Sequence, residues 1–186
     1  PSAEVAYCGG DHHTVDHDEH DDTHRTDWDH HYHLLGDTVY RGHGMRLPGN
    51  IHQVVHDAGR PEAERAHALL EHIDEHQQGV HWTTNLDSAH HYMNLERHPN
   101  DYRAPDPQVT GYVLHAHTPP RSDIETDDDR LRNNQVIGYD AHDDNEVPLQ
   151  DGSDVHVKGI TWHDNATGTL HHNELAAPRQ MTARRA

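Results

Sequence analysis

Apolar side chains in the first half of the chain recur at the spacing of a helix face. Between residues 51 and 58 they stand at i, i+3, i+4 and i+7, and the same spacing returns between residues 66 and 73. The second stretch follows Pro61, a residue favoured in the first turn of a helix. Ahead of both, Thr38-Val39-Tyr40 has the composition of a short strand. The pattern predicts a strand and then two amphipathic helices, with buried faces made of Ile51, Val54, Val55 and Ala58, and of Ala66, Leu69, Leu70 and Ile73.

A third helix is predicted beyond a short strand at residues 80–84. Asn85 or Asp87 can cap its first turn, because both side chains accept hydrogen bonds from backbone N–H groups. Its buried side is expected to hold Ala89, Tyr92 and Met93.

Strand signals dominate the rest of the chain. They appear at residues 112–117, which Pro119 and Pro120 follow, and at residues 146–149 and 155–162 on either side of a turn. Helical patterns therefore come early and strands come late. This order predicts an α+β fold rather than a regular alternation of strand and helix.

Composition divides the chain into three parts. Residues 1–33 form an arm in which eight His stand among Asp and Glu with almost nothing apolar, so it cannot bury a core face. We expect either a solvated arm or a weak, multi-site binder of divalent metal, because imidazole and carboxylate groups bind zinc, nickel or copper. Residues 34–165 hold the predicted elements and are expected to fold. Residues 166–186 end in the basic sequence PRQMTARRA and are predicted to be a tail.

The content of apolar residues limits the size of the core. Only 31% of the residues are hydrophobic and Phe is absent, against roughly 45–50%, with Gly counted, in ordinary globular chains. The single cysteine, Cys8, permits neither an intrachain disulfide nor a cysteine-based zinc site. A large apolar core and a disulfide scaffold are therefore both excluded.

Charge limits the classes of partner. Asp and Glu outnumber Lys and Arg by 33 to 14, for a formal net charge of −19. Binding to nucleic acid or to an anionic membrane is therefore disfavoured, and cationic partners are favoured. No apolar run approaches the roughly 18 residues of a membrane span, and residues 1–10 lack the pattern of a signal peptide. We expect a soluble, cytoplasmic protein, and export without a signal peptide stays open.

Three short segments in a fixed order carry candidate chemistry: Tyr40-Arg41-Gly42 at a strand end, GVHWTTN at residues 79–85 before a helix, and DNEVPL at residues 144–149 entering a strand. Together they resemble the arginine, serine and glutamate signature of the mono-ADP-ribosyltransferase family of bacterial toxins, phage enzymes and vertebrate surface enzymes. The last segment is the most specific, because residues 138–162 follow the family's order of loop, catalytic Glu, apolar residues, turn and strand. The resemblance covers roughly residues 37–163 and leaves the His-rich arm unexplained.

This resemblance implies a fold and an activity. The implied fold has two small packed β-sheets and N-terminal helices. The implied activity is transfer of ADP-ribose from NAD, which serves as a substrate, to an acceptor that is most often a protein side chain. Hydrolysis of NAD is a side reaction of such a site. The resemblance also implies a phage or bacterial origin.

Glu146 is the candidate catalytic residue, because cleavage of the bond between nicotinamide and ribose leaves positive charge on the sugar. A carboxylate fixed beside the ribose is attracted more strongly in the transition state than in the ground state. Arg41 can hold the pyrophosphate by paired hydrogen bonds, next to Tyr40 in the same segment. Gly42 is expected to let the dinucleotide approach the backbone.

Other members of the site follow from the resemblance. Thr83 and Thr84 stand where the family has its Ser-Thr-Ser strand, and a hydroxyl there would orient the catalytic carboxylate. Trp82 or Tyr139 could stack on a ring of the substrate. Asp144 stands two residues before Glu146, where the family tends to carry Glu or Gln, so the identity of the acceptor stays open. The acidic loop around Asp144 favours a cationic acceptor protein.

Two alternatives compete with this hypothesis. One is a non-enzymatic, acidic, His-rich protein that binds divalent metal or serves in a larger assembly. His115 and His117 lie two apart on a predicted strand, hence on one face, and His90-His91 or His156 could complete a metal site. The other is a transferase fold that has kept only a binding function. Cleavage of NAD separates the hypotheses.

Overall fold

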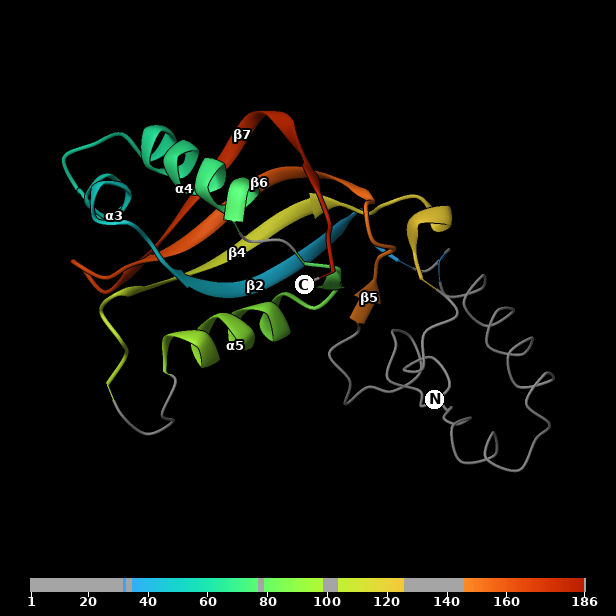
Figure 1. The fold of residues 1–186 in the computed structure, drawn as a ribbon, viewed down its shortest axis with the longest axis horizontal. Coiled ribbons are helices and arrows are strands. Elements are labelled where there is room, and N and C mark those ends of the chain that lie inside the picture. Colours follow the sequence, from blue (N-terminus) through green and yellow to red (C-terminus); the bar gives the residue numbers. More distant parts are fainter. Residues whose placement is uncertain (1–31, 33–34, 77–78, 99–103, 126–145, 186) are drawn as a thin grey trace.

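The computed structural model describes residue 32 and residues 35–76, 79–98, 104–125 and 146–185 (Figure 1). Two predicted site residues, Asp144 and Tyr139, lie outside the described residues. The elements follow in the order β2 (Thr38–Arg46), α3 (Gly49–Val55), α4 (Glu62–His76), β3 (His81–Thr83), α5 (Leu86–Arg97), β4 (Val109–His117), the 3-10 helix η1 (Arg121–Asp123), β5 (Glu146–Pro148), β6 (Asp154–Asp164) and β7 (Thr169–Thr182).

These strands form one antiparallel sheet in the order β5-β3-β2-β4-β6-β7. Helices α3 and α4 lie on one side of it and α5 on the other (Figure 1). The predicted α+β class is confirmed. The two packed sheets implied by the resemblance are not found in the described part of the chain, where the six strands form one sheet with helices on both of its faces. Among the residues that the structure describes, no helix is both long and apolar enough to cross a membrane.

Helix α4 matches its prediction, whereas α3 is shorter than expected. α4 begins directly after Pro61 and buries the four predicted residues. α3 ends at Val55, so Ala58 is outside the helix and exposed. The Asp57 carboxylate accepts a hydrogen bond from the Gly59 N–H at 2.9 Å. Such a local turn competes with continuation of the helix.

Helix α5 begins at the predicted cap, because the Asn85 side chain accepts hydrogen bonds from the two N–H groups that open the helix. Ala89 and Met93 are buried as predicted, but Tyr92 is 40% exposed, so that part of the prediction is wrong. The reason is the narrow contact between α5 and the sheet. A Cβ atom on Gly42 of β2 would overlap the backbone carbonyl of Ala89. The helix therefore sits on the glycine through Ala89 and Met93, and Tyr92 lies beside the contact.

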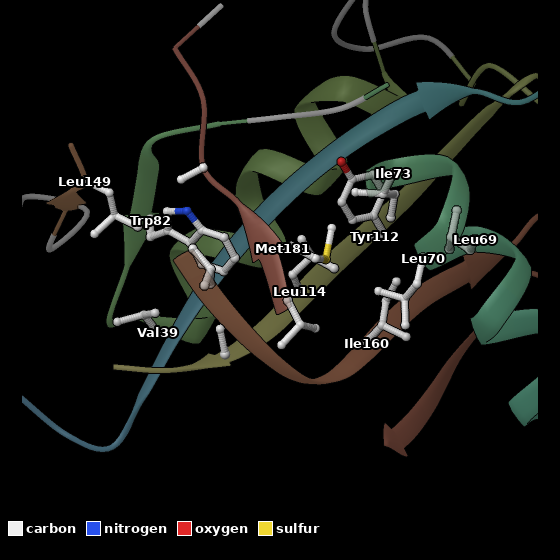
Figure 2. Close-up of a cluster of buried hydrophobic side chains, with 14 of the residues drawn as sticks. Val39, Leu69, Leu70, Ile73, Trp82, Tyr112, Leu114, Leu149, Ile160 and Met181 are labelled. Carbon is white, nitrogen blue, oxygen red and sulfur yellow. The ribbon is translucent and has the colours of Figure 1, made fainter. Parts of the chain in front are cut away.

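A single large cluster of buried side chains joins the strands to α4 (Figure 2). Leu70 and Ile73 come from α4, Trp82 from β3, Leu114 from β4 and Ile160 from β6. Each is buried, and together they bury the apolar face of a helix against the apolar face of a sheet. A smaller cluster lies on the α5 side and contains Ala89, Met93 and Val113.

The segment 166–186, predicted to be a tail, contains the longest strand of the described chain, β7. Val157 pairs with Arg179 and Gly159 with Glu174, so four residues of β7 bulge out opposite Lys158. After the bulge, Arg179 Nη2 donates to Asp74 Oδ2 of α4 at 3.1 Å. β7 is a largely exposed edge strand, which explains why its sequence lacks the apolar alternation of a strand.

The predicted boundary between the N-terminal arm and the folded part, at residue 33, also differs from the structure. Tyr32, placed in the arm at residues 1–33, packs against the main core, and its hydroxyl donates to the Pro119 carbonyl at 3.0 Å. Tyr32 therefore belongs to the folded part.

A buried charged pair ties α4 to the end of β6. Arg65 Nη2 donates to Asp164 Oδ2 at 2.8 Å, and the two side chains are only 2% and 0% exposed. Asp164 also accepts hydrogen bonds from the Ala166 N–H at 2.9 Å and from His171 Nε2 at 3.1 Å. Burial alone would raise the pKa of the Asp164 carboxyl, but these donors outweigh it, so that pKa lies below its ordinary value. The Asp164 carboxylate thus accepts hydrogen bonds from α4, from β7 and from the turn between β6 and β7.

His56 lies beside this pair and is neutral. Its Nδ1 accepts the Asn165 N–H at 3.2 Å, so Nε2 carries the proton and donates to Thr110 Oγ1 at 2.8 Å. Burial, helped by the nearby His52 and opposed by Asp164, lowers the pKa of His56 to about 4.

Candidate functional site

A cavity of about 330 Å³ opens where β2, β3, β5 and α5 meet. This volume is at the lower end of the roughly 300–1,000 Å³ of small-molecule sites. The walls carry both aromatic and charged side chains. The lining residues are Tyr40, Arg41, Gly42, His43, His81, Trp82, Thr83, Tyr92, Glu96 and Glu146.

The three signature segments meet at this cavity on neighbouring strands. Tyr40 of β2 is the register partner of Thr83 on β3, and Thr83 is the partner of Glu146 on β5. Directly opposed residues of an antiparallel pair project on the same face of a sheet. Tyr40, Thr83 and Glu146 therefore form one row across three strands.

Arg41 projects on the opposite face from Tyr40, because successive side chains of a strand alternate. Its Nη1 donates to the His81 carbonyl at 3.1 Å, and its guanidinium packs where a side chain on Gly79 would overlap it. Burial lowers the pKa of Arg41, and Tyr112 and the Glu96 carboxylate act in the opposite direction. Arg41 thus lines the cavity, and its guanidinium lies beside Gly79 and the His81 carbonyl.

Glu146 is held by a residue that the sequence analysis left without a role. His81 Nδ1 lies 3.1 Å from Glu146 Oε2. The Glu146 side chain is 23% exposed and that of His81 is 53% exposed, so the pair is at the mouth of the cavity. His81 stands two residues before Thr83 on a strand. This spacing is the sequence signal that would have placed His81 on the same face as Thr83 and Glu146.

Several predicted site residues also have structural contacts. Trp82 is 5% exposed and lies in the main core, with Nε1 donating to the Gly79 carbonyl at 3.2 Å, so its ring is packed rather than presented for stacking (Figure 2). Thr83 Oγ1 accepts the Asn85 N–H at 3.0 Å and so forms the turn into α5. Thr84 does not line the cavity. Gly42 lines it, but the close approach that needs a glycine there is that of α5.

Three further lining residues were not predicted. Tyr92 and Glu96 stand four apart on α5 and so share a helix face. His43 of β2 lies with Nδ1 3.5 Å from Glu96 Oε1. The i, i+4 spacing on α5 was readable in the sequence, but the direction of that face depends on how the helix packs.

His115, one of the histidines proposed as an alternative metal site, has other partners. His115 Nε2 lies 3.0 Å from Thr161 Oγ1, which lies 2.9 Å from His172 Nδ1. Burial, together with the nearby His172, lowers the pKa of His115 to about 4. In the described residues no group of three or more His, Cys, Asp or Glu is arranged to hold a metal ion. The His-rich stretch at residues 11–33 lies outside the described residues, Tyr32 excepted.

In chemical terms, the cavity combines two carboxylates with aromatic rings and a guanidinium. Glu96 and Glu146 favour a group that carries or develops positive charge, and Tyr40 and Tyr92 offer ring surfaces to a planar group. Arg41 favours an anionic oxygen. No family model matches the sequence, and neither a curated protein nor a solved structure matches the chain.

Proposed function

We propose that this chain is an NAD-dependent mono-ADP-ribosyltransferase, which transfers ADP-ribose from NAD to a protein side chain or, as a side reaction, to water. The observation that supports the proposal is the shared cavity of the three signature segments. Tyr40, Thr83 and Glu146 are far apart in the sequence, yet they form one row across β2, β3 and β5. Each segment is recognisable from its own residue types, whereas their meeting depends on the register of three strands.

In the proposed reaction the bond between the ribose C1′ atom and the nicotinamide nitrogen breaks. The bonding electron pair leaves with nicotinamide. The nitrogen or oxygen of an acceptor N–H or O–H group then bonds to C1′, and its proton passes to a carboxylate of the cavity or to water. Between these events the sugar carries positive charge, so a fixed carboxylate stabilises the transition state more than bound NAD. Glu146 is the group proposed for this role.

Binding of NAD is assigned to residues of β2 and α5. The Arg41 guanidinium can pair with the pyrophosphate, because its planar N–H groups match two phosphate oxygens. Tyr92, which is 40% exposed, and Tyr40 offer faces on which the nicotinamide or adenine ring can stack. They take the stacking role first predicted for Trp82.

A cationic protein is the proposed acceptor. The net charge of −19 favours encounter with a basic partner, and the carboxylate of Glu96 adds a second negative group to the cavity. A guanidinium or ammonium side chain that enters beside the ribose would therefore be attracted.

The experiment is incubation of the full chain with NAD labelled in the ADP-ribose part, with and without a basic acceptor protein. Release of nicotinamide reports cleavage, and label on protein reports transfer. Glu146→Gln is expected to lower turnover by about two or more orders of magnitude and to keep most of the NAD affinity, because the carboxylate acts in the transition state. Glu71→Gln is the matched control, since Glu71 is an exposed carboxylate of α4 paired with His67 at 3.3 Å.

Three outcomes decide between the hypotheses. Cleavage by the wild-type chain that is lost in Glu146→Gln and kept in Glu71→Gln supports the proposal. Binding of NAD by calorimetry without cleavage or transfer would favour a fold that has kept only a binding function. If the wild-type chain neither binds nor cleaves NAD, the proposal is refuted.

A further inference from the structure

His81, in the signature segment at residues 79–85, contacts both of the other signature segments. Its backbone carbonyl accepts a hydrogen bond from Arg41 Nη1 at 3.1 Å, and its imidazole Nδ1 lies 3.1 Å from Glu146 Oε2. All three residues line the cavity. One residue of β3 thus joins the guanidinium of β2 to the carboxylate of β5.

The direction of the hydrogen bond to Glu146 follows from its chemistry. An ionised carboxylate has no proton to give, so His81 Nδ1 carries the proton and donates it. A hydrogen bond to a charged acceptor is stronger than one between neutral groups. It holds Oε2 in place and thereby fixes the plane of the whole carboxylate. The backbone of His81 is itself fixed, because β3 pairs with β5 at His81 and Pro148.

We propose that His81 is the positioning residue of this site, which orients the Glu146 carboxylate toward the developing positive charge of the ribose. The inference rests on the proposed function and adds to it a residue of the 79–85 segment to which the resemblance gives no role. The Thr83 hydroxyl, which the resemblance expects to orient Glu146, accepts the Asn85 N–H and keeps its own proton to donate, so His81 acts beside Thr83 rather than in its place. His81 stands two residues earlier on the same face of the same strand.

Substitutions of His81 separate positioning from packing. His81→Ala is expected to lower kcat for NAD cleavage by about 10- to 100-fold with little change in KM, because a small misplacement of a catalytic group affects the transition state more than substrate binding. His81→Asn keeps an N–H near the position of Nδ1 and should recover most of the loss. His81→Gln carries the same amide one methylene further and should recover little.

The matched control removes another exposed histidine that faces a glutamate. His67 and Glu71 of α4 lie 3.3 Å apart, away from the cavity lining. His67→Ala should keep the wild-type kcat. Urea unfolding of each variant reports whether it is folded, and if His81→Ala does not fold, the comparison of His81→Asn with His81→Gln still tests the inference.

The outcomes separate this inference from the function on which it rests. Recovery in His81→Asn but not in His81→Gln supports positioning. Wild-type kcat in His81→Ala, or in His81→Gln, would overturn the inference and leave the transferase proposal standing. Equal losses in the Asn and Gln variants would assign His81 a packing role and would also overturn it. Absence of NAD cleavage by the wild-type chain would overturn both.

Discussion

Replacing Asp164 by Asn is expected to destabilise the fold strongly, because this carboxylate neutralises a buried guanidinium. Arg65 and Asp164 are 2% and 0% exposed and lie 2.8 Å apart. The substitution keeps the volume of the side chain and removes its charge. Arg65 would then be a buried charge without a counter-ion, for which the cost is about 3–5 kcal/mol. Since domains are stable by only about 5–15 kcal/mol, this loss is a large fraction of the total.

The assay is urea unfolding followed by tryptophan fluorescence. Trp162 is a direct reporter of this region, because the Arg65 guanidinium lies 5.5 Å from the centre of its ring and the His171 ring stacks on it. The urea concentration at the midpoint of unfolding should fall, while the slope of the free energy of unfolding against urea stays constant. This combination shows that the stability of the fold, and not the denatured state, has changed. A double variant, Arg65→Met with Asp164→Leu, should recover part of the loss, since it removes both charges.

The control is a pair of similar geometry at the surface. Arg60, just before α4, and Glu64, in its first turn, form this pair. Arg60 Nη1 lies 2.6 Å from Glu64 Oε1, and both side chains are more than two-fifths exposed. Glu64→Gln should have little or no measurable effect, because solvent screens the pair. If Asp164→Asn changed stability no more than Glu64→Gln does, burial would not be the source of the energy and the reasoning would be refuted.

Three further predictions concern the sheet, the pH dependence and the candidate site. In thermal melts, Gly42→Ala should destabilise the chain by about 1–3 kcal/mol or more, because its Cβ would overlap the Ala89 carbonyl. The control, Gly49→Ala, places its Cβ in open space and should be neutral or slightly stabilising. Equal effects of the two substitutions would contradict the packing of α5 on Gly42. The pKa of His56 is lowered from 6.5 in the unfolded chain to about 4 in the folded chain. Between these two pH values the unfolded state binds more protons. The contribution of neutral His56 to the free energy of unfolding is therefore complete above pH 6.5 and is lost as the pH falls toward 4. The free energy of unfolding should therefore fall by about 2 kcal/mol between pH 7 and pH 5 from His56 alone, with His115 acting in the same direction, and a constant value over this range would disprove the assignment of a neutral buried imidazole. Arg41→Lys keeps the charge and loses the planar fork, so calorimetry should show NAD binding weakened by about 1–3 kcal/mol; unchanged affinity would remove Arg41 from the proposed site.

Local chemistry made several elements predictable from the sequence. The apolar spacing behind Pro61 predicted α4 and its buried face, and Asn85 predicted the start of α5. These features depend on residues within one or two helical turns, so the sequence contains all the information they need. The three signature segments were recognisable for the same reason, since each is short and carries its own residue types.

Other features were decided only by the packing of distant segments. β7 was missed because an exposed edge strand needs no apolar alternation, and its position is fixed by hydrogen bonds to β6. Gly42 serves the approach of α5, and Trp82 lies in the core, although the signature suggested contact with the substrate for both.

The candidate site shows the same division. Its residue types, Arg41, Thr83 and Glu146, were fixed by the sequence, but their directions were not. Which of them share a face depends on strand register, because a shift of one residue moves every side chain to the other side of the sheet. The observed register aligns Tyr40, Thr83 and Glu146 and places His81 against Glu146. The contact between His81 and Glu146 joins residues that are neighbours only after folding, so tertiary structure alone decided it.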